Sequence, residues 1–312
     1  MNPYKRMKNS TNFMDLNDDC LLYLLNFMKL EELLMLRGVC IRFDNLLYQY
    51  RKRFDYFSIR DLPGAYEALQ FLGPVIKTIY LYPRTFQNAV PEIFDWITEF
   101  CVNLESLDLA GVDVIPKQKF ITLVRRVTSL TMRGVYFDDS LGDCFKGTSI
   151  EELKLVALRD LTEQFFIHIS NLRALTICCC RTMPCDSYIQ VLKKNLNLKK
   201  LEIKVSDGWY SPNEIKDSDK LVEYIANNLH EIEELTFDSS VSNRSLFGNL
   251  PNLKKLEIEL NELDEFDELD SWSWNQISHD INKLIENLSK SNTIEILFIN
   301  GYEHHIDMVN WS

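Results

Sequence analysis

The chain has 312 residues, with 34 Lys and Arg against 46 Asp and Glu, which gives a formal net charge of −12 at pH 7. Hydrophobic residues make up 46% of the chain and there are only ten glycines and nine prolines, so the composition excludes a disordered, collagen-like or linker protein. A chain this acidic opposes binding to a phosphate backbone, and we expect no nucleic-acid partner.

Residues 1–13 are basic and polar, and they lack the apolar run of a secretory signal. The strongest apolar run, residues 21–36, is interrupted by Lys29, Glu31 and Glu32, so it does not have the pattern of a membrane span. We therefore expect an N-terminal tail over residues 1–13, no membrane association, and a cytoplasmic and/or nuclear location.

Three short helices are predicted between residues 14 and 55. Apolar residues recur there at helical spacing from Leu16 to Leu47. Residues 17–19 supply a cap and negative charge for a helix start, and residues 29–32 supply the next break. The apolar positions exceed what so small a module can bury. The surplus either packs on the rest of the chain, which periodicity alone favours, or is reserved for a partner.

The residue order in this segment resembles the F-box motif. Residues 16–25 stand at its opening Leu-Pro and its Leu/Ile helix, and residues 33–40 match its Leu-Leu-x-Leu-Arg-x-Val-Cys segment. Asn17 and Leu30 stand where the family often has proline, and Phe43 stands at the closing Trp. The resemblance assigns residues 14–55 to an F-box.

This resemblance implies the substrate receptor of an SCF-type cullin-RING ubiquitin ligase. Such a receptor docks on the Skp adaptor and, through it, on the cullin and RING subunits, and it holds a target protein for ubiquitination and degradation. It needs no catalytic group, because holding the target raises its effective concentration. The adaptor-binding residues that the motif implies are Leu16, Cys20, Leu21, Leu24, Leu33, Leu36, Val39 and Phe43. Some of these should be internal to the F-box.

The rest of the chain carries a repeat of the form L-x-x-L-x-L. It occurs nine times, with Leu, Ile, Val, Met or Phe at the marked positions, and successive copies lie 21 to 41 residues apart. The last two marked residues are two apart and share one face of a short strand. Helical periodicity fills several intervals: residues 93–100, 117–124, 188–196, 221–229 and 281–288. Several of these stretches end in Asn, a residue that tolerates helix ends, as at Asn195.

These triplets resemble the leucine-rich-repeat family. The resemblance predicts an α/β fold over residues 56–312, with about nine irregular repeats. A curved parallel sheet would line the concave side of a solenoid, and helices or irregular turns would lie outside.

Residues that alternate with the apolar strand positions should face the concave side, where a target would bind. This alternation also exposes Ala110, Thr176 and Cys178. The candidates for target binding are Tyr80, Tyr82, Asp108, Arg133, Lys154, Glu202, Lys204, Asp238, Glu257 and Glu259. They begin aromatic, become mixed or basic, and end acidic. The alternative for each charged residue is that it only solvates the sheet face, which is the usual role of such a charge.

Two long intervals add candidates. The predicted loop at residues 206–213 contains Trp209 and Tyr210, which either recognise a target or pin the loop itself. Residues 257–270 hold eight acidic and no basic side chains and precede Trp272 and Trp274. This acidity favours a target with a basic patch, and a solvated acidic loop is the alternative.

No pattern predicts an enzyme or a cofactor. The eight cysteines lack disulfide-framework spacing and are expected to be reduced. The consecutive residues 178–180 would point to alternating faces, so their thiols should not share a metal ion. His304, His305 and Asp307 lack the spacing of a helical ligand pair. We expect a non-catalytic receptor subunit; the alternative is a leucine-rich-repeat scaffold that binds proteins without assembling with a cullin.

Overall fold

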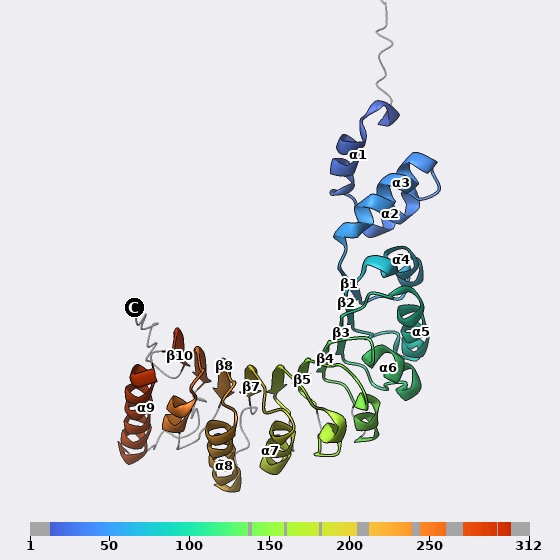
Figure 1. The fold of residues 1–312 in the computed structure, drawn as a ribbon. Helices are drawn as coiled ribbons and strands as arrows, with labels where there is room; N and C mark the ends of the chain where they lie inside the picture. Colours follow the sequence, from blue (N-terminus) through green and yellow to red (C-terminus); the bar gives the residue numbers. More distant parts are fainter. Residues whose placement is uncertain are drawn as a thin grey trace, which may run out of the picture.

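The computed structural model describes residues 13–136, 139–158, 161–180, 183–204, 212–238, 244–259, 271–291 and 293–300. A helical module leads into a ten-stranded sheet whose strands follow chain order. The strands line the inner side of an arc, and helices and 3-10 turns cover its outer side (Figure 1). None of the described helices is long and apolar enough to cross a bilayer.

All the strand pairings are parallel and in one register. The central residue of each triplet pairs with the central residue of the next, as Ile79 does with Leu107 and Leu107 with Leu130. The strands are β1 (Tyr56–Ile59), β2 (Thr78–Leu81), β3 (Ser106–Ala110), β4 (Ser129–Arg133), β5 (Glu152–Val156), β6 (Ala174–Cys178), β7 (Lys200–Lys204), β8 (Glu234–Asp238), β9 (Lys255–Glu259) and β10 (Ile296–Asn300). The nine predicted triplets are confirmed as β2 to β10.

Strand β1 is a tenth repeat that the sequence analysis missed. Phe54, Phe57 and Ile59 satisfy the L-x-x-L-x-L spacing, and Phe57 pairs with the central residue Ile79 of β2. Because Phe occupies two of its three marked places, the copy is harder to recognise than those built on Leu and Ile.

The outer layer mixes helices with 3-10 turns. It contains α4 (Ala65–Leu72), η3 (Gly73–Val75), η4 (Gln87–Ala89), α5 (Val90–Phe100), α6 (Lys117–Val124), η5 (Asp139–Phe145), η6 (Phe165–His168), α7 (Cys185–Lys193), α8 (Pro212–Asn228), η7 (Arg244–Asn249) and α9 (Ser271–Ser291). The five predicted helical stretches are confirmed as helices, although α7 ends at Lys193 and α8 at Asn228, short of the predicted ends at residues 196 and 229. Helix α8 already begins at Pro212, so the end of the predicted loop at residues 206–213 is helical instead.

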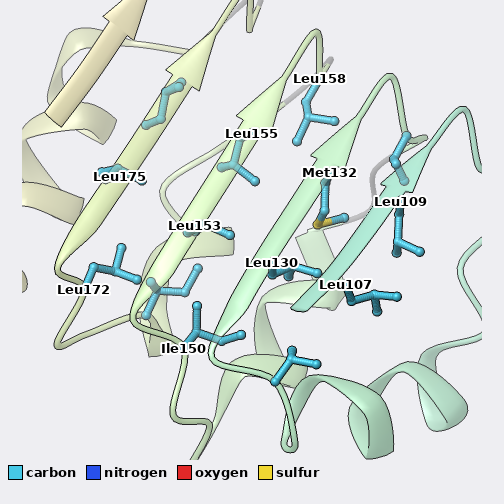
Figure 2. Packing of buried hydrophobic residues seen from close by; sticks show 14 of the residues in the cluster. Leu107, Leu109, Leu130, Met132, Ile150, Leu153, Leu155, Leu158, Leu172 and Leu175 are labelled. Atoms are coloured by element: carbon cyan, nitrogen blue, oxygen red, sulfur yellow. The ribbon is translucent and has the colours of Figure 1, made fainter. Parts of the chain in front are cut away.

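The core runs along the solenoid between the sheet and the outer layer. Aliphatic side chains of successive strands project to the same side of the sheet (Figure 2). Beneath them, four phenylalanines of successive repeats form a row, with ring centroids 6.5, 6.3 and 5.0 Å apart: Phe94, Phe120, Phe145 and Phe165. Burying each such side chain contributes about 1.5 to 3 kcal/mol, so each repeat is stabilised chiefly by its neighbours.

Asparagines connect neighbouring repeats. The buried Asn195 accepts a hydrogen bond from the Leu172 amide at 2.8 Å and donates one to the Val191 carbonyl at 2.8 Å. Asn103 donates to the Pro74 carbonyl of the preceding repeat at 2.7 Å. Asn195 therefore satisfies a buried backbone amide of the preceding repeat. Both asparagines link their repeat to the one before it, which is more than the helix-end role predicted from sequence.

The helical module covers the β1 end of the solenoid. It comprises η1 (Phe13–Asp15), α1 (Asp18–Leu25), α2 (Leu30–Leu36), α3 (Ile41–Tyr50) and η2 (Arg51–Arg53). Leu25, Leu33 and Leu47 belong to the same buried cluster as the solenoid core. Arg51 donates a hydrogen bond from Nη1 to the Phe71 carbonyl of α4 at 2.9 Å. The module and the repeats are therefore packed as neighbours.

Candidate functional site

The helical module exposes an unusual number of large apolar side chains. Nine of them lie within residues 14–48, and only eight more are spread over the described residues from 56 to 296. The nine, which we name the exposed apolar set, are Met14, Leu16, Tyr23, Leu24, Phe27, Met35, Val39, Ile41 and Tyr48. Their exposed fractions run from 36% at Leu16 to 82% at Ile41. The module therefore exposes large apolar side chains far more densely along the chain than the solenoid does.

The eight residues implied by the motif divide between surface and core. Leu16, Cys20, Leu24 and Val39 are exposed, and Leu36 is half-buried. Leu21, Leu33 and Phe43 are buried. Leu21 and Phe43 form a small cluster with Leu46, so these buried side chains hold the helices together and are not available to an adaptor.

Several exposed residues of the module were not predicted. Tyr23 and Phe27 are four residues apart, and their rings meet edge to face with centroids 5.2 Å apart. Met35 and Ile41 are exposed on α2 and at the start of α3. The places of Tyr23 and Phe27, each two residues from a buried leucine of α1, were a signal in the helical pattern, because residues off the buried stripe of a helix face outward.

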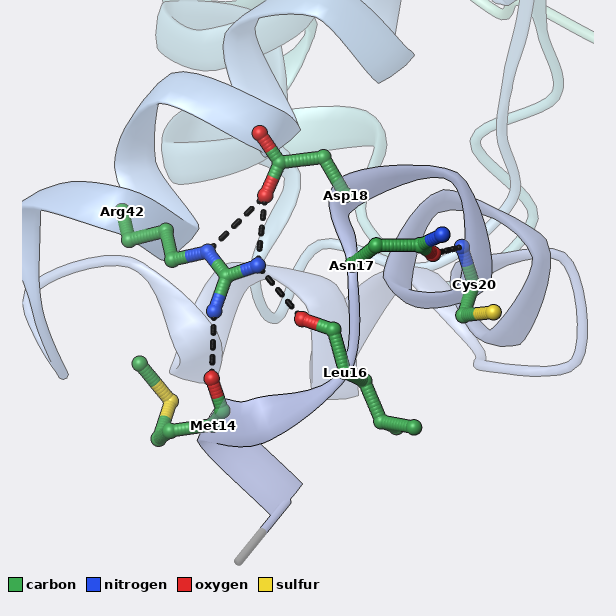
Figure 3. Close-up of polar contacts among 6 residues, drawn as sticks. All are labelled: Met14, Leu16, Asn17, Asp18, Cys20 and Arg42. Atoms are coloured by element: carbon green, nitrogen blue, oxygen red, sulfur yellow. Dashed lines mark hydrogen bonds and ion pairs between the residues drawn. The ribbon is translucent and has the colours of Figure 1, made fainter.

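Arg42 fixes the start of α1 (Figure 3). Its Nε and Nη2 donate to Asp18 Oδ1 at 2.8 and 2.7 Å. It also donates to the carbonyls of Met14 and Leu16, each at 2.6 Å. Asn17 caps the helix by accepting from the Cys20 amide at 2.8 Å, which stabilises the helix start. Two exposed apolar residues, Met14 and Leu16, are thereby held against α3.

Tyrosines and arginines gather at the N-terminal end of the concave face. The predicted residues Tyr80 and Tyr82 lie with ring centroids 6.3 Å apart. The guanidinium of Arg60 lies 5.7 Å from the Tyr80 ring centroid, and that of Arg84 lies 4.7 Å from the Tyr82 ring centroid. Neither arginine was a sequence candidate, because each follows its strand and lies outside the triplet pattern.

On the middle strands of the concave face, opposite charges form ion pairs, one between neighbouring strands and one within a strand. Asp108 and Arg133 form an ion pair at 3.0 Å, and Glu202 and Lys204 approach to 3.8 Å. Burial raises the pKa of Asp108, although Arg133 and Lys154 act in the opposite direction. Each pair is neutral overall, and Lys154 of β5 adds a further cation near Asp108.

Three concave positions expected to be exposed are in fact buried: Ala110, Thr176 and Cys178. Thr176 donates from its hydroxyl to Glu202 at 3.1 Å, and the Cys178 sulfur lies 3.7 Å from the other Glu202 oxygen. The Glu202 side chain therefore covers both, a contact that alternation along one strand does not predict.

At the C-terminal end, Glu257 is paired with Lys255 at 3.3 Å. Asp238 and Glu259 are register partners at the ends of β8 and β9. Trp272 and Trp274 begin α9. Trp209, Tyr210, the stretch 260–270, His304, His305 and Asp307 lie outside the described residues.

The buried thiols are poor nucleophiles. Burial raises the pKa of Cys101 and Cys178 to about 12 and that of Cys180 to about 11, so these thiols are neutral at ordinary pH. In the part of the chain that the structure describes, no three His, Cys, Asp or Glu residues are placed to hold a metal ion.

Ten stacked L-x-x-L-x-L strands in one parallel sheet, backed by helices and turns, define a leucine-rich-repeat solenoid, a fold of the protein-binding type. No protein-family model and no curated protein sequence matches the chain.

Solved structures similar to the chain include internalin C2 of Listeria monocytogenes, at 15% identity and a TM-score of 0.41, over 75% of this chain and 84% of that one. The yeast Rad7–Elc1 complex matches at 13% identity and a TM-score of 0.42, over 95% and 92%. Internalin InlF of L. monocytogenes matches at 15% and 0.42, over 80% of this chain and 62% of its own length. The fold assignment stands on the strand order and register of the present structure.

Proposed function

We propose that the chain is the substrate receptor of an SCF-type ubiquitin ligase, which docks on the Skp adaptor through residues 14–55 and holds a target protein on its repeats. The observation that carries the proposal is the exposed apolar set, which lies within the segment that resembles the F-box. Removing apolar side chains from water is favourable, so a partner that covers them is bound more tightly.

The receptor positions the target and carries out no catalytic step itself. The helical module stands at one end of the arc and the concave strands line its inner side (Figure 1). A target on the strands and an adaptor on the helices are then bound to one packed body, because module and repeats share a core. Ubiquitin transfer to the target becomes effectively intramolecular.

The proposal is tested by co-purification of the full chain with the Skp adaptor and cullin. The test variant is Leu24→Glu with Val39→Glu, since both side chains are exposed and belong to the residues that the motif implies. Leu21 is unsuitable because it is buried. The matched control is Val102→Glu with Val114→Glu, two exposed valines of the solenoid.

We expect the wild type and the control to retain the adaptor in equal stoichiometry and the test variant to lose it, with all three unfolding at the same denaturant concentration. Equal retention by the test variant would contradict the assigned surface. The absence of a complex with any of the three would contradict the receptor function.

The second candidate is a leucine-rich-repeat scaffold whose helices serve as a cap. It is favoured by Leu25, Leu33 and Leu47, which extend the solenoid core into the module. Terminal repeats need such covering for stability. A scaffold of this kind would bind its partners without adaptor or cullin, so the same co-purification separates the two functions.

A further inference from the structure

Four side chains form what we name the arginine–tyrosine cluster: Arg60, Tyr80, Tyr82 and Arg84. Tyr80 lies on β2, Arg60 directly follows β1, and Tyr82 and Arg84 follow β2. Each guanidinium lies within 6 Å of a tyrosine ring centroid, the range in which a cation is attracted to an aromatic face. Both arginines are exposed.

The arginines of this cluster differ from three other concave cations. Arg133, Lys204 and Lys255 each form an ion pair with a carboxylate of the same or a neighbouring strand. Within the described ranges, Arg60 and Arg84 form no ion pair. Arg60 Nε donates to Ser58 Oγ at 3.2 Å, and Arg84 Nε donates to the Tyr82 hydroxyl. Each is held through Nε, and the two terminal nitrogens remain for a ligand.

The cluster rests on a rigid base. Gly111 lies beneath Tyr82 with φ +60°, and a Cβ at this position would come within 2.9 Å of the tyrosine ring. Gln87 donates to the Gly111 carbonyl at 2.7 Å and accepts from the Asp113 amide at 3.1 Å. The Tyr82 amide donates to the Ile59 carbonyl at 3.0 Å. A surface fixed in this way loses little entropy when a ligand binds.

The nearest register neighbour does not neutralise the cluster. Asp108 pairs with Tyr80 in the β2–β3 register, but its carboxylate is bonded to Arg133 of β4, on the side away from β2. Asp108 therefore does not pair with either arginine of the cluster, on a protein whose net charge is −12.

We infer that the arginine–tyrosine cluster binds an acidic segment of the target protein, with carboxylates of the segment on the terminal nitrogens of Arg60 and Arg84. The planar guanidinium fork matches a carboxylate in a bidentate geometry, and the tyrosines supply apolar surface beside it. This inference rests on the proposed function in one respect, that the bound protein is the target of the receptor.

The test is fluorescence anisotropy with the full chain and three fluorescein-labelled ten-residue peptides, in which Ser alternates with Glu, Gln or Lys. We expect the Glu peptide to bind about tenfold or more tightly than the Gln peptide, and more weakly as salt is added. The Lys peptide measures attraction to the acidic remainder of the chain. Its affinity should not fall when the arginines of the cluster are replaced.

The decisive variant is Arg60→Glu with Arg84→Glu. Its matched control is Arg125→Glu with Lys146→Glu, two exposed cations of the outer layer that change the net charge equally. Binding of the Glu peptide should be lost in the first and retained in the second. Equal affinity for the Glu and Gln peptides, or equal loss in both variants, would overturn the inference.

This measurement uses the chain without adaptor or cullin. If the proposed receptor function is wrong, the wild-type chain will form no adaptor complex and will still bind the Glu peptide. Failure of the present inference would appear as lost peptide selectivity with the adaptor complex intact.

Discussion

The side chain of Arg42, on α3, is bonded to three residues at and just before the start of α1. It donates to the Met14 and Leu16 carbonyls and to the Asp18 carboxylate. The ion pair with Asp18 is partly exposed and by itself contributes little. The hydrogen bonds to two carbonyls add more, since a charged donor strengthens each of them.

Arg42→Ala should lower the free energy of local unfolding at the start of α1 by about 1 to 2 kcal/mol. Hydrogen exchange of residues 14–25 in the full chain measures this, and the exchange should become correspondingly faster. Arg125→Ala, at an exposed site on the outer layer, is the control. Unchanged exchange in the Arg42 variant would show that the start of α1 is held by its apolar contacts alone.

Sequence reasoning placed the adaptor candidates on three helices that the structure contains, and it did not separate their buried and exposed faces. Helical spacing puts Leu21 and Leu24 on one apolar stripe, but only the packing of α1 on α3 buries Leu21 beside Phe43 and leaves Leu24 outside. Arg60 and Arg84 were missed for a related reason, because their role depends on the tyrosines of a neighbouring repeat or loop and not on spacing along the chain.

Adjacent repeats are also joined by charge. Glu233, just before β8, accepts from Lys199 Nζ at 2.8 Å and from Lys254 Nζ at 2.6 Å. These lysines stand just before β7 and β9. The hydrogen bonds from Lys199 and Lys254 lower the pKa of Glu233 from 4.5 to about 2. One carboxylate therefore bridges three consecutive repeats.

Glu233→Gln should remove a stabilisation that depends on pH. A carboxylate whose pKa is lower in the folded state stabilises the fold above its unfolded pKa and loses this effect as pH falls through the folded value. The difference in urea midpoint between the wild type and the variant should be full above pH 5 and vanish near pH 2. Glu231→Gln, an exposed carboxylate nearby, is the control. A difference that does not change with pH would contradict the lowered pKa.

The strands were predictable and much of the outer layer was not. The triplets identify β2 to β10 because each strand must bury the same two positions in register with its neighbours. The outer layer has no such constraint, and it can cover the core with a helix such as α6 or a 3-10 turn such as η5. Both bury a phenylalanine in the same row, Phe120 in one and Phe145 in the other.

On the scale of the whole molecule, two different surfaces occur on one body. The exposed apolar set lies on the helical module, and the arginine–tyrosine cluster lies on the first strands of the concave face. Apolar burial suits a constitutive partner, and charged groups suit a partner selected by sequence. This division is consistent with the proposed function, in which a receptor joins one adaptor to its target.

The measurement that tests this account most directly is hydrogen exchange of the full chain with and without the Skp adaptor. The account predicts slower exchange in α1, α2 and α3 and unchanged exchange in the concave strands β2 to β9. Exchange that is unchanged throughout, or slowed on the strands instead of the helices, would contradict it.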